Sequence, residues 1–521
     1  MKVHLVWHPY RYFPYERELA RREAETLFGE KIKTSADGLT VETNNGWRDI
    51  ASRLTYFREA VGSDGSRIVP KQARLEESAN GSPIRRQSTR YSAHGLHEYK
   101  GKFNPQIVRA IGNILGLREN DWVLDPFCGS GTVLLEAAHI GWNGIGLDIN
   151  PLSVEVSRAK IAAVHVSPDV LTRSLEQICA ELDLQNRVDF NKAFSRTQIS
   201  TMGAAGWKEY LRCPDYLSEW FSESVLAQLY LILVALDRLS DSARLIFRVV
   251  LSDIVRDVSF QDPGDLRIRR LKSPPANRPA IPIYLDTLKR RVALILKARR
   301  QVRSTKTFQS AIVTDARQLG DHRAVKGNKF DAVITSPPYA TALPYIDTDR
   351  LSLVLLGLVD ATAMRATERS LIGNREITTS DRKQIEEAMI GPNSGLTKKC
   401  LSLCRTLLRA VGENDGFRRR NLASLVHKYF LDMGNVFDQL HSVLRPGAPA
   451  AIVVGPNSTR LGDQKFVIDT PDLLADLARE RGFKIEESIR FDTYQRFNLH
   501  QANAIRAETL LIVRENSDHA H

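Results

Sequence analysis

The chain has 521 residues and a net charge of +12, with 43% hydrophobic and 26% charged residues. This composition is ordinary for a globular protein of two to four domains, and no apolar run approaches the roughly 20 residues of a membrane span. Val3–Trp7 is too short for a secretory signal, and five scattered cysteines make neither a disulfide framework nor a zinc site. We therefore expect a cytoplasmic, reduced protein without membrane or metal.

The first 60 residues are expected to form a small α/β module. Its predicted strands are Val3–Trp7 and Leu39–Thr43, and its predicted helices are Tyr15–Phe28 and Trp47–Ala60. Residues 61–93 are rich in Ser, Gly, Arg and Gln, and we interpret them as a linker.

A βαβ pattern occupies residues 94–163. A short apolar strand, Trp122–Asp125, enters a loop that contains Gly129 and Gly131. An apolar helical run follows, and a second strand ends in Asp148. Glycines allow a ligand to approach the backbone closely, and an acid at the end of the second strand can accept hydrogen bonds from both ribose hydroxyls.

The ligand of this pattern is predicted to be cationic. The loop lacks the G-x-G-x-x-G of dinucleotide enzymes and the Gly-Lys-Ser/Thr ending of a phosphate-binding loop. Asp125, just before the glycines, would repel a pyrophosphate but suits an amine. S-adenosylmethionine carries an amine, a sulfonium and a ribose, so we expect it to be the cofactor.

A mainly helical insertion, residues 164–306, ends in a strongly basic stretch. Residues 256–306 hold fourteen Lys or Arg against four Asp, and such a concentration of positive charge suits a polyphosphate backbone. The candidate nucleic-acid-binding residues are Arg267, Arg269, Arg270, Lys272, Arg290 and Arg291.

Residues 307–345 carry the motif Thr335-Ser336-Pro337-Pro338-Tyr339 after a short apolar strand. The two prolines stiffen the loop, since each fixes φ and neither has an N–H. Ser336 adds an acceptor, and Tyr339 offers a ring that could stack on a base. A loop of this kind suits a site that holds a planar amine.

A second helical insertion is predicted at residues 346–440, and residues 441–521 are predicted to return to strands. About seven strands in α/β alternation predict a doubly wound Rossmann-like sheet. Ligands of such sheets lie outside the carboxyl ends of the strands. The side chains of Asp125, Asp148, Asp315 and Ser336 all fall at or just past such ends.

Asp-Pro-Phe-Cys-Gly-Ser-Gly-Thr (125–132) together with Thr-Ser-Pro-Pro-Tyr (335–339) resembles the amino-methyltransferases of DNA, which methylate cytosine N4 or adenine N6 with S-adenosylmethionine. The resemblance implies catalytic roles for Ser336, Pro337, Pro338 and Tyr339. It implies that the cofactor contacts Lys102, Phe103, Asp125, Phe127, Gly129, Gly131, Asp148 and Asp315.

The target base is left open by this resemblance. Ser-Pro-Pro-Tyr accompanies cytosine N4 methylation most often, whereas the order of the motifs resembles a class that more often carries Asp in place of Ser336. We therefore expect DNA cytosine N4 first and adenine N6 second. Residues 16–24 faintly resemble a module of tRNA guanine methyltransferases, which keeps an RNA substrate as a further alternative. A restriction or defence nuclease as partner is also left open.

Overall fold

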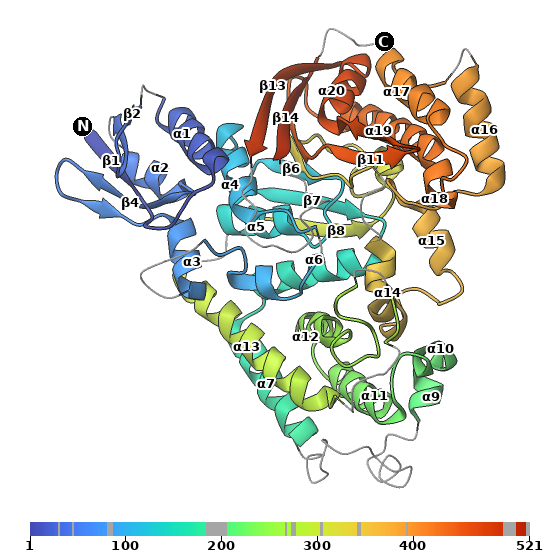
Figure 1. Cartoon of the computed structure of the whole chain (residues 1–521). Helices are drawn as coiled ribbons and strands as arrows, with labels where there is room; N and C mark the ends of the chain where they lie inside the picture. Colours follow the sequence, from blue (N-terminus) through green and yellow to red (C-terminus); the bar gives the residue numbers. More distant parts are fainter. Residues whose placement is uncertain are drawn as a thin grey trace.

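The structure is a computed structural model of the chain. It describes residues 1–29, 32–43, 46–80, 87–99, 101–183, 206–265, 268–271, 278–302, 306–340, 345–391, 394–492 and 507–516. Figure 1 shows an N-terminal module beside a central sheet, with a helical lobe below the sheet and a second group of helices above it. None of the described helices combines the length and the apolar composition that crossing a membrane requires.

The N-terminal module is built on a five-stranded sheet of order β2-β3-β1-β4-β5. Its strands are β1 (Lys2–Trp7), β2 (Lys33–Thr34), β3 (Gly38–Glu42), β4 (Phe57–Gly62) and β5 (Arg67–Ile68). The helices α1 (Pro14–Phe28), α2 (Trp47–Arg53) and α3 (Lys71–Asn80) accompany them.

Two sequence predictions for this module are wrong. The helix predicted to reach Ala60 ends at Arg53, because Phe57–Gly62 pairs antiparallel with the central strand β1 and buries Phe57 and Ala60. The segment interpreted as a linker carries β5, α3 and the short 3₁₀ helix η1 (Ser92–Gly95). Pairing with distant strands overrides the local polar composition there.

The central sheet has seven strands in the order β13-β14-β10-β9-β6-β7-β8. Its strands are β6 (Trp122–Asp125), β7 (Asn143–Asp148), β8 (Gln309–Val313), β9 (Ala332–Thr335), β10 (Pro449–Val454), β13 (Phe483–Asp492) and β14 (Ala507–Glu515). Strands β8, β7, β6, β9 and β10 pair in parallel, and β14 pairs antiparallel with both β10 and β13. The predicted doubly wound Rossmann-like sheet is confirmed.

The order of the strands places a crevice between β6 and β9. The chain passes from β6 to β7 to β8 on one side and then resumes at β9 on the other side of β6. In open α/β sheets ligands bind outside the carboxyl ends of the strands at such a reversal. Asp125 ends β6 and Thr335 ends β9, so both predicted motifs lie at this point.

Helices cover both faces of the sheet. On one face α4 (Pro105–Ile114) and α5 (Thr132–Ile140) share a hydrophobic core with the N-terminal module. On the other face the core contains side chains of α17 (Lys398–Arg409), α19 (Leu422–Val443) and α20 (Thr470–Glu480).

The first helical insertion forms the lower lobe in Figure 1. It is built from α7 (Pro168–Asp183), α9 (Trp207–Tyr210), α10 (Pro214–Ser218), α11 (Glu223–Asp237), α12 (Asp241–Ile254) and α13 (Ala280–Gln301). Together with α6 (Pro151–His165) and α14 (Tyr345–Leu355) they enclose a hydrophobic core of their own.

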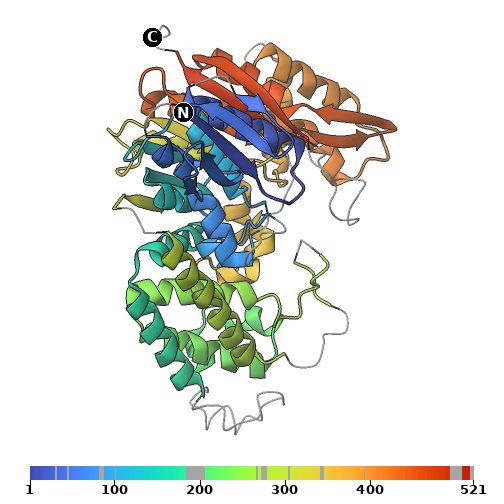
Figure 2. The same cartoon turned by 90° about the vertical axis from the view of Figure 1, so that its left-hand side faces the viewer.

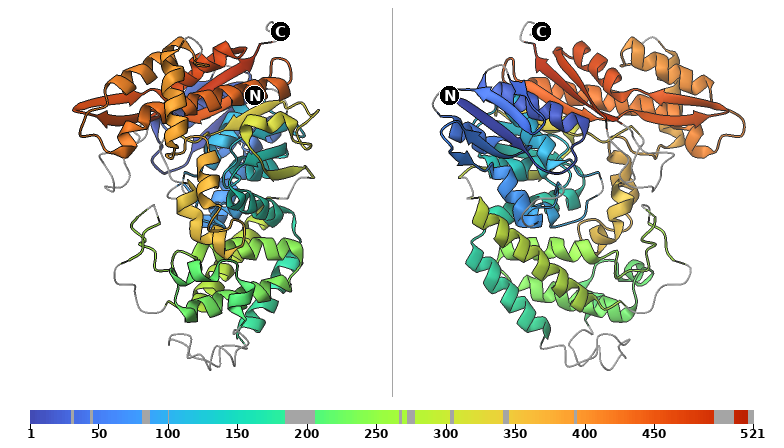
Figure 3. Two further views of the ribbon diagram at one scale, coloured as in Figure 1. Left: turned by 90° about the vertical axis from the view of Figure 1, so that its right-hand side faces the viewer. Right: turned by 60° about the vertical axis from the view of Figure 1, so that its left-hand side comes forward.

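The second insertion continues with α15 (Met364–Ser370), α16 (Thr379–Ile390) and the short α18 (Phe417–Arg420). After β10, a two-stranded hairpin formed by β11 (Asn457–Leu461) and β12 (Gln464–Ile468) precedes α20. Figures 2 and 3 show this hairpin projecting from the upper part of the molecule.

Candidate active site

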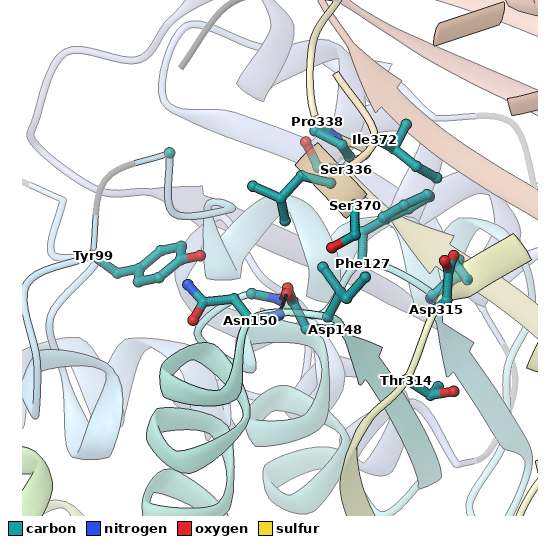
Figure 4. Close-up of a pocket in the computed structure, with 16 residues that line it drawn as sticks. Tyr99, Phe127, Asp148, Asn150, Thr314, Asp315, Ser336, Pro338, Ser370 and Ile372 are labelled. Carbon is teal, nitrogen blue, oxygen red and sulfur yellow. Dashed lines mark hydrogen bonds between the residues drawn. The ribbon is translucent and has the colours of Figure 1, made fainter. Parts of the chain in front are cut away.

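A pocket opens at the carboxyl ends of the parallel strands. Figure 4 shows Ser336 and Pro338 on one side of it, with Asp148 and Asn150 on the other. The lining residues are Tyr99, Gly101, Pro126, Phe127, Gly129, Asp148, Ile149, Asn150, Thr314, Asp315, Ala316, Ser336, Pro338, Ser370, Leu371 and Ile372.

Asp148 is held by backbone donors at the end of β7. Its Oδ2 accepts a hydrogen bond from the Gly129 N–H at 3.0 Å, and its Oδ1 accepts one from the Asn150 N–H at 2.8 Å. Burial disfavours the charged form and raises the pKa of Asp148 to about 6, although these hydrogen bonds oppose the shift. The carboxyl is therefore fixed in direction, and a positive ligand would favour its ionised form.

Asp125 joins the two predicted motifs. Its Oδ1 accepts hydrogen bonds from the Thr335 hydroxyl at 2.7 Å and from the Phe127 N–H at 3.1 Å. Burial raises the pKa of Asp125 to about 7, and the negative charge of Asp148 adds to the rise. Asp125 lies just behind the lining residues, where it fixes the glycine loop to the strand that carries Ser336.

A third carboxyl, Asp349 of α14, was missed by the sequence analysis. The Asn150 Nδ2 donates a hydrogen bond to its Oδ2 at 2.9 Å. Burial raises the pKa of Asp349 to about 7, and the charge of Asp148 again contributes. Asp349 comes from a helix that follows the predicted catalytic loop, residues 335–339, so no local pattern connected it with the glycine loop.

The residues at this end of the pocket fit S-adenosylmethionine. Three neighbouring carboxyls with raised pKa values would each be stabilised in the ionised form by a cation, and the cofactor carries an amine and a sulfonium. Gly129 has a φ of 46°, and a Cβ there would stand 3.4 Å from the Tyr99 ring. That distance is ordinary contact, so it is the positive φ that favours glycine here, and the bare backbone of Gly129 lines the pocket beside the Tyr99 ring.

Asp315 lies on another wall of the pocket, just after β8. Its two carboxylate oxygens accept hydrogen bonds from Arg317, whose guanidinium also contacts Asp432 and the Ser370 carbonyl. Burial opposes ionisation of Asp315, but the hydrogen bonds and charge of Arg317 outweigh it and lower the pKa. Arg317 thus keeps Asp315 charged and ties it to the segment 370–372.

Ser370, Leu371 and Ile372 line the pocket although the sequence analysis did not select them. The turn after them holds this segment against the catalytic loop, since a Cβ on Gly373 would stand 2.8 Å from the Tyr339 carbonyl oxygen. The Asn374 Nδ2 donates to the carbonyls of Arg369 and Leu371 and so shapes the turn. A Gly-Asn pair was the one local signal that could have marked it.

The four predicted catalytic residues take different positions. Ser336 and Pro338 line the pocket, and Pro337 is buried. The Ser336 hydroxyl forms no hydrogen bond with any residue that the structure describes. Tyr339 is not among the lining residues, and its hydroxyl donates to Glu508 at the start of β14.

Lys102 and Phe103 line a neighbouring cavity rather than this pocket. Burial lowers the pKa of Lys102 to about 7, and the charge of Arg90 contributes; its Nζ donates to the carbonyls of Thr89 and His94. From the same segment, Tyr99 and Gly101 reach the pocket, and Tyr99 belongs to both cavities.

The predicted basic residues do not form one surface. Arg269 and Arg270 lie near the Gln261–Arg270 bridge, where Arg270 stands over the Phe260 ring at 5.3 Å. Arg290 lies exposed on α13, whereas Arg291 is half-buried and donates to Asp253 at 2.8 Å. Figure 2 shows α13 and the bridge segment on separate parts of the helical lobe. Arg267 and Lys272 lie outside the described residues.

The seven-stranded sheet and the acid-lined pocket at its reversal define the class of S-adenosylmethionine-dependent methyltransferases. In agreement with this class, a family model described as RMKL-like, methyltransferase domain (UPF0020) matches residues 95–188. This match covers the glycine loop and Asp148 but not Ser336.

Among curated proteins, the chain has relatives that align with it over most of the length of both proteins. The chain is 23% identical over 427 residues to the type II methyltransferase M.BsoBI of Geobacillus stearothermophilus, covering 75% of this chain and 79% of the relative. It is 21% identical over 480 residues to M.AvaI of Anabaena variabilis, covering 89% and 92%. These similarities confirm the resemblance to DNA amino-methyltransferases.

One further similarity is to a tRNA methyltransferase, and another is to a solved structure. The chain is 33% identical over 91 residues to a tRNA (guanine(10)-N2)-dimethyltransferase of Methanothermobacter thermautotrophicus, covering 18% of this chain and 26% of the relative. Among solved structures, TrmN from Thermus thermophilus aligns over 99% of both chains with 10% identity and a TM-score of 0.33.

Proposed function

We propose that the protein transfers a methyl group from S-adenosylmethionine to an exocyclic amine in DNA, with cytosine N4 as the target. One observation carries the proposal. Ser336, whose hydroxyl has no partner among the described residues, lines the same pocket as Asp148. An amine acceptor and a site for a cationic cofactor therefore open into one space.

The cofactor would lie along the acid-lined side of the pocket. Asp148 would accept from its ribose hydroxyls, Asp125 and Asp349 would balance its positive charge, and Phe127 and Ile149 would pack on its apolar parts. When bound, it supplies an electrophilic methyl group. The contact of Asp315 with the adenine amine stays a prediction from the resemblance.

The catalytic loop would orient the amine of the base. The lone pair of an exocyclic amine is delocalised into the ring, so the nitrogen must become more tetrahedral before it can attack. The Ser336 hydroxyl and the Pro337 carbonyl would each accept one amine hydrogen, which directs the lone pair and stabilises the positive charge that develops on nitrogen. No nucleophile of the protein is needed, and Cys128 is buried, where burial raises the pKa of its thiol.

Tyr339 has a different position from the one that stacking requires. Its hydroxyl donates to Glu508, so the ring would have to turn from β14 to lie against a base in the pocket. A base from a duplex would first have to be flipped out, which costs a few kcal/mol. We propose that this turn of Tyr339 accompanies entry of the base.

Ser336 favours cytosine over adenine. A neutral hydroxyl is a weaker acceptor than the carboxylate that stands at this position in the Asp-Pro-Pro-Tyr motif. The similarity to type II methyltransferases, which covers 75% and 89% of the chain in the two relatives, supports DNA as the polymer. The helical lobe, residues 164–306, would contact it through exposed residues such as Arg269 and Arg290.

An RNA substrate is the second candidate, and a specific observation favours it. The similarity to a tRNA (guanine(10)-N2)-dimethyltransferase reaches 33% identity, but it covers 91 residues only. Incubation of the purified protein with labelled S-adenosylmethionine and either duplex DNA or unmodified tRNA separates the two. We expect label in DNA; label in tRNA alone would overturn the proposal.

A further inference from the structure

The β11–β12 hairpin presents a positively charged face to solvent. Its residues alternate, so that Leu461 and Ile468 are buried while Arg460 and Lys465 are exposed. Val467, on the exposed face, is 62% exposed. This alternation is typical of a two-stranded ribbon that packs one face against the protein and exposes the other face to solvent, where a partner can bind.

Two cations stand directly opposite each other on that free face. Arg460 pairs with Lys465 in the antiparallel register, and like charges in opposed positions destabilise a sheet. Neither side chain has an ion pair or a hydrogen bond with any residue in the described part of the chain. An anion between them would remove the repulsion.

The short helix α18 adds an arginine and an aromatic ring beside the hairpin. Asp415 accepts hydrogen bonds from the N–H groups of Gly412 and Gly462, and so fixes the hairpin turn to the start of α18. Phe417 is 69% exposed. Arg418 is exposed and has no partner among the described residues, whereas Arg419 and Arg420 bind Asp415. We call Arg418, Arg460, Lys465 and Phe417 the hairpin surface.

The base of the hairpin adjoins the catalytic loop. At the base of the hairpin, the Asn457 Nδ2 donates to the Ala340 carbonyl at 2.6 Å, one residue after Tyr339. Figures 2 and 3 show the hairpin projecting on the same side of the molecule as the Gln261–Arg270 segment of the lower lobe. A polymer that enters the active site from this side would pass the hairpin.

We propose that the hairpin surface binds the phosphate backbone of duplex DNA next to the base that enters the pocket, which rests on the function proposed above. The three unpaired cations neutralise phosphates, and the Phe417 ring stacks on an exposed base or packs on a sugar. The surface thus forms a second contact region, separate from the basic residues of the helical lobe.

The test replaces the three cations together, as Arg418→Gln, Arg460→Gln and Lys465→Gln. Binding of a fluorescein-labelled mixed-sequence DNA duplex is followed by anisotropy over a series of salt concentrations. Each lost phosphate contact reduces the magnitude of the slope of log K against log salt by about 0.9. The slope of the triple variant should therefore be smaller in magnitude than that of the parent by about 2 to 3. Phe417→Ala should weaken binding about fivefold or more without changing the slope.

A matched control removes three exposed cations near the amino ends of the parallel strands, away from the catalytic loop: Arg323→Gln, Lys326→Gln and Lys484→Gln. This control should keep the salt slope to within about 1. Both triple variants should keep the thermal midpoint and the cofactor affinity of the parent, since the substituted side chains are exposed.

The outcomes separate the two proposals. If the parent protein binds and methylates DNA but the hairpin variant keeps its slope and affinity, the inference is wrong while the proposed function stands. If the salt slope falls by the same amount in both triple variants, the change reflects net charge alone, and the inference is also wrong. If the parent neither binds nor methylates duplex DNA, the proposed function itself has failed.

Discussion

At the scale of single residues, the proposed function divides the site into side chains that would hold the cofactor and side chains that would orient the base. Asp148 belongs to the first group, because its oxygens are fixed at the end of β7 beside the glycine loop. Ser336 belongs to the second, because its hydroxyl is free within the described residues and lines the same pocket. This division predicts different kinetic losses for the two positions.

Ser336→Ala should lower the single-turnover rate by about 10²–10³-fold and leave cofactor affinity nearly unchanged, since it removes an acceptor used as charge develops on nitrogen. Asp148→Ala should weaken cofactor binding by about tenfold to a hundredfold with a smaller effect on the rate at saturation. Ser370→Ala is the control, because that hydroxyl lines the pocket but donates to Thr367. Equal losses in rate and affinity for both main variants would sink the assignment.

Cofactor affinity should depend on pH through Asp148. Its pKa is about 6, so below that pH the carboxyl must lose its proton before both of its oxygens can accept hydrogen bonds from the ribose hydroxyls. Affinity, measured by calorimetry, should rise by up to about tenfold per pH unit below pH 6, and the rise should continue to about pH 7 as Asp125 and Asp349 ionise. Asp148→Asn should flatten the profile near pH 6, and an unchanged profile would exclude Asp148 as the titrating group.

The folding stability of the ligand-free protein should depend on pH in the opposite direction, so that the contribution of Asp148 falls as the pH rises. Burial raises the pKa of Asp148 above its value in the unfolded chain, so the folded state holds the proton more firmly. The resulting stabilisation is complete below the unfolded pKa and is lost as the pH rises through about 6. Denaturant unfolding of the parent and of Asp148→Asn at several pH values measures this contribution.

At the scale of elements, the turn after Ile372 controls the position of the catalytic loop. Gly373 has a φ of 74°, and an added Cβ would meet the Tyr339 carbonyl oxygen at 2.8 Å. Gly373→Ala should therefore displace the loop and lower turnover roughly tenfold or more. Gly447→Ala is the matched control, with a φ of 73° and no atom within 4 Å of the added Cβ. Similar turnover in the two variants would show that the contact does not matter.

Elements with a strong local pattern could be predicted from the sequence. The strands that end at Asp125, Asp148 and Thr335 are short apolar runs before turn residues, and the structure forms strands there. The strand β4 could not be predicted, because its half-polar sequence becomes a strand only through pairing with β1.

The candidate site could be predicted only in part, for a similar reason. Its motif residues carry a signal because glycine, proline and acidic residues stand at strand ends. Asp349 and Ser370 reach the site from the second insertion, and their positions depend on how α14 and α15 fold back. Lys102 could not be placed either, since its carbonyl partners are set by the fold around η1.

At the scale of the whole molecule, the N-terminal module shares its core with the central sheet. Leu5 and Leu19 of the module belong to the same hydrophobic cluster as Ile111 of α4 and Ile334 of β9. The buried Glu23 of α1 accepts hydrogen bonds from Thr55 and from Asn113 of α4. The module and the methyltransferase domain should therefore unfold together.

Leu19→Ala should destabilise the entire molecule by about 2–5 kcal/mol, because Leu19 is fully buried. Loss of circular dichroism and loss of cofactor binding should shift together to lower denaturant concentration. If the module were an independent domain, the transition of the cofactor pocket would keep its midpoint.

The central claim is that the protein methylates cytosine N4 in DNA, and the most direct measurement is mass spectrometry of nucleosides from DNA of cells that express the chain. The parent protein should produce N4-methylcytosine, and the Ser336→Ala variant should produce little or none. N6-methyladenine without N4-methylcytosine, or no methylated DNA base beside methylated guanine in tRNA, would contradict the claim.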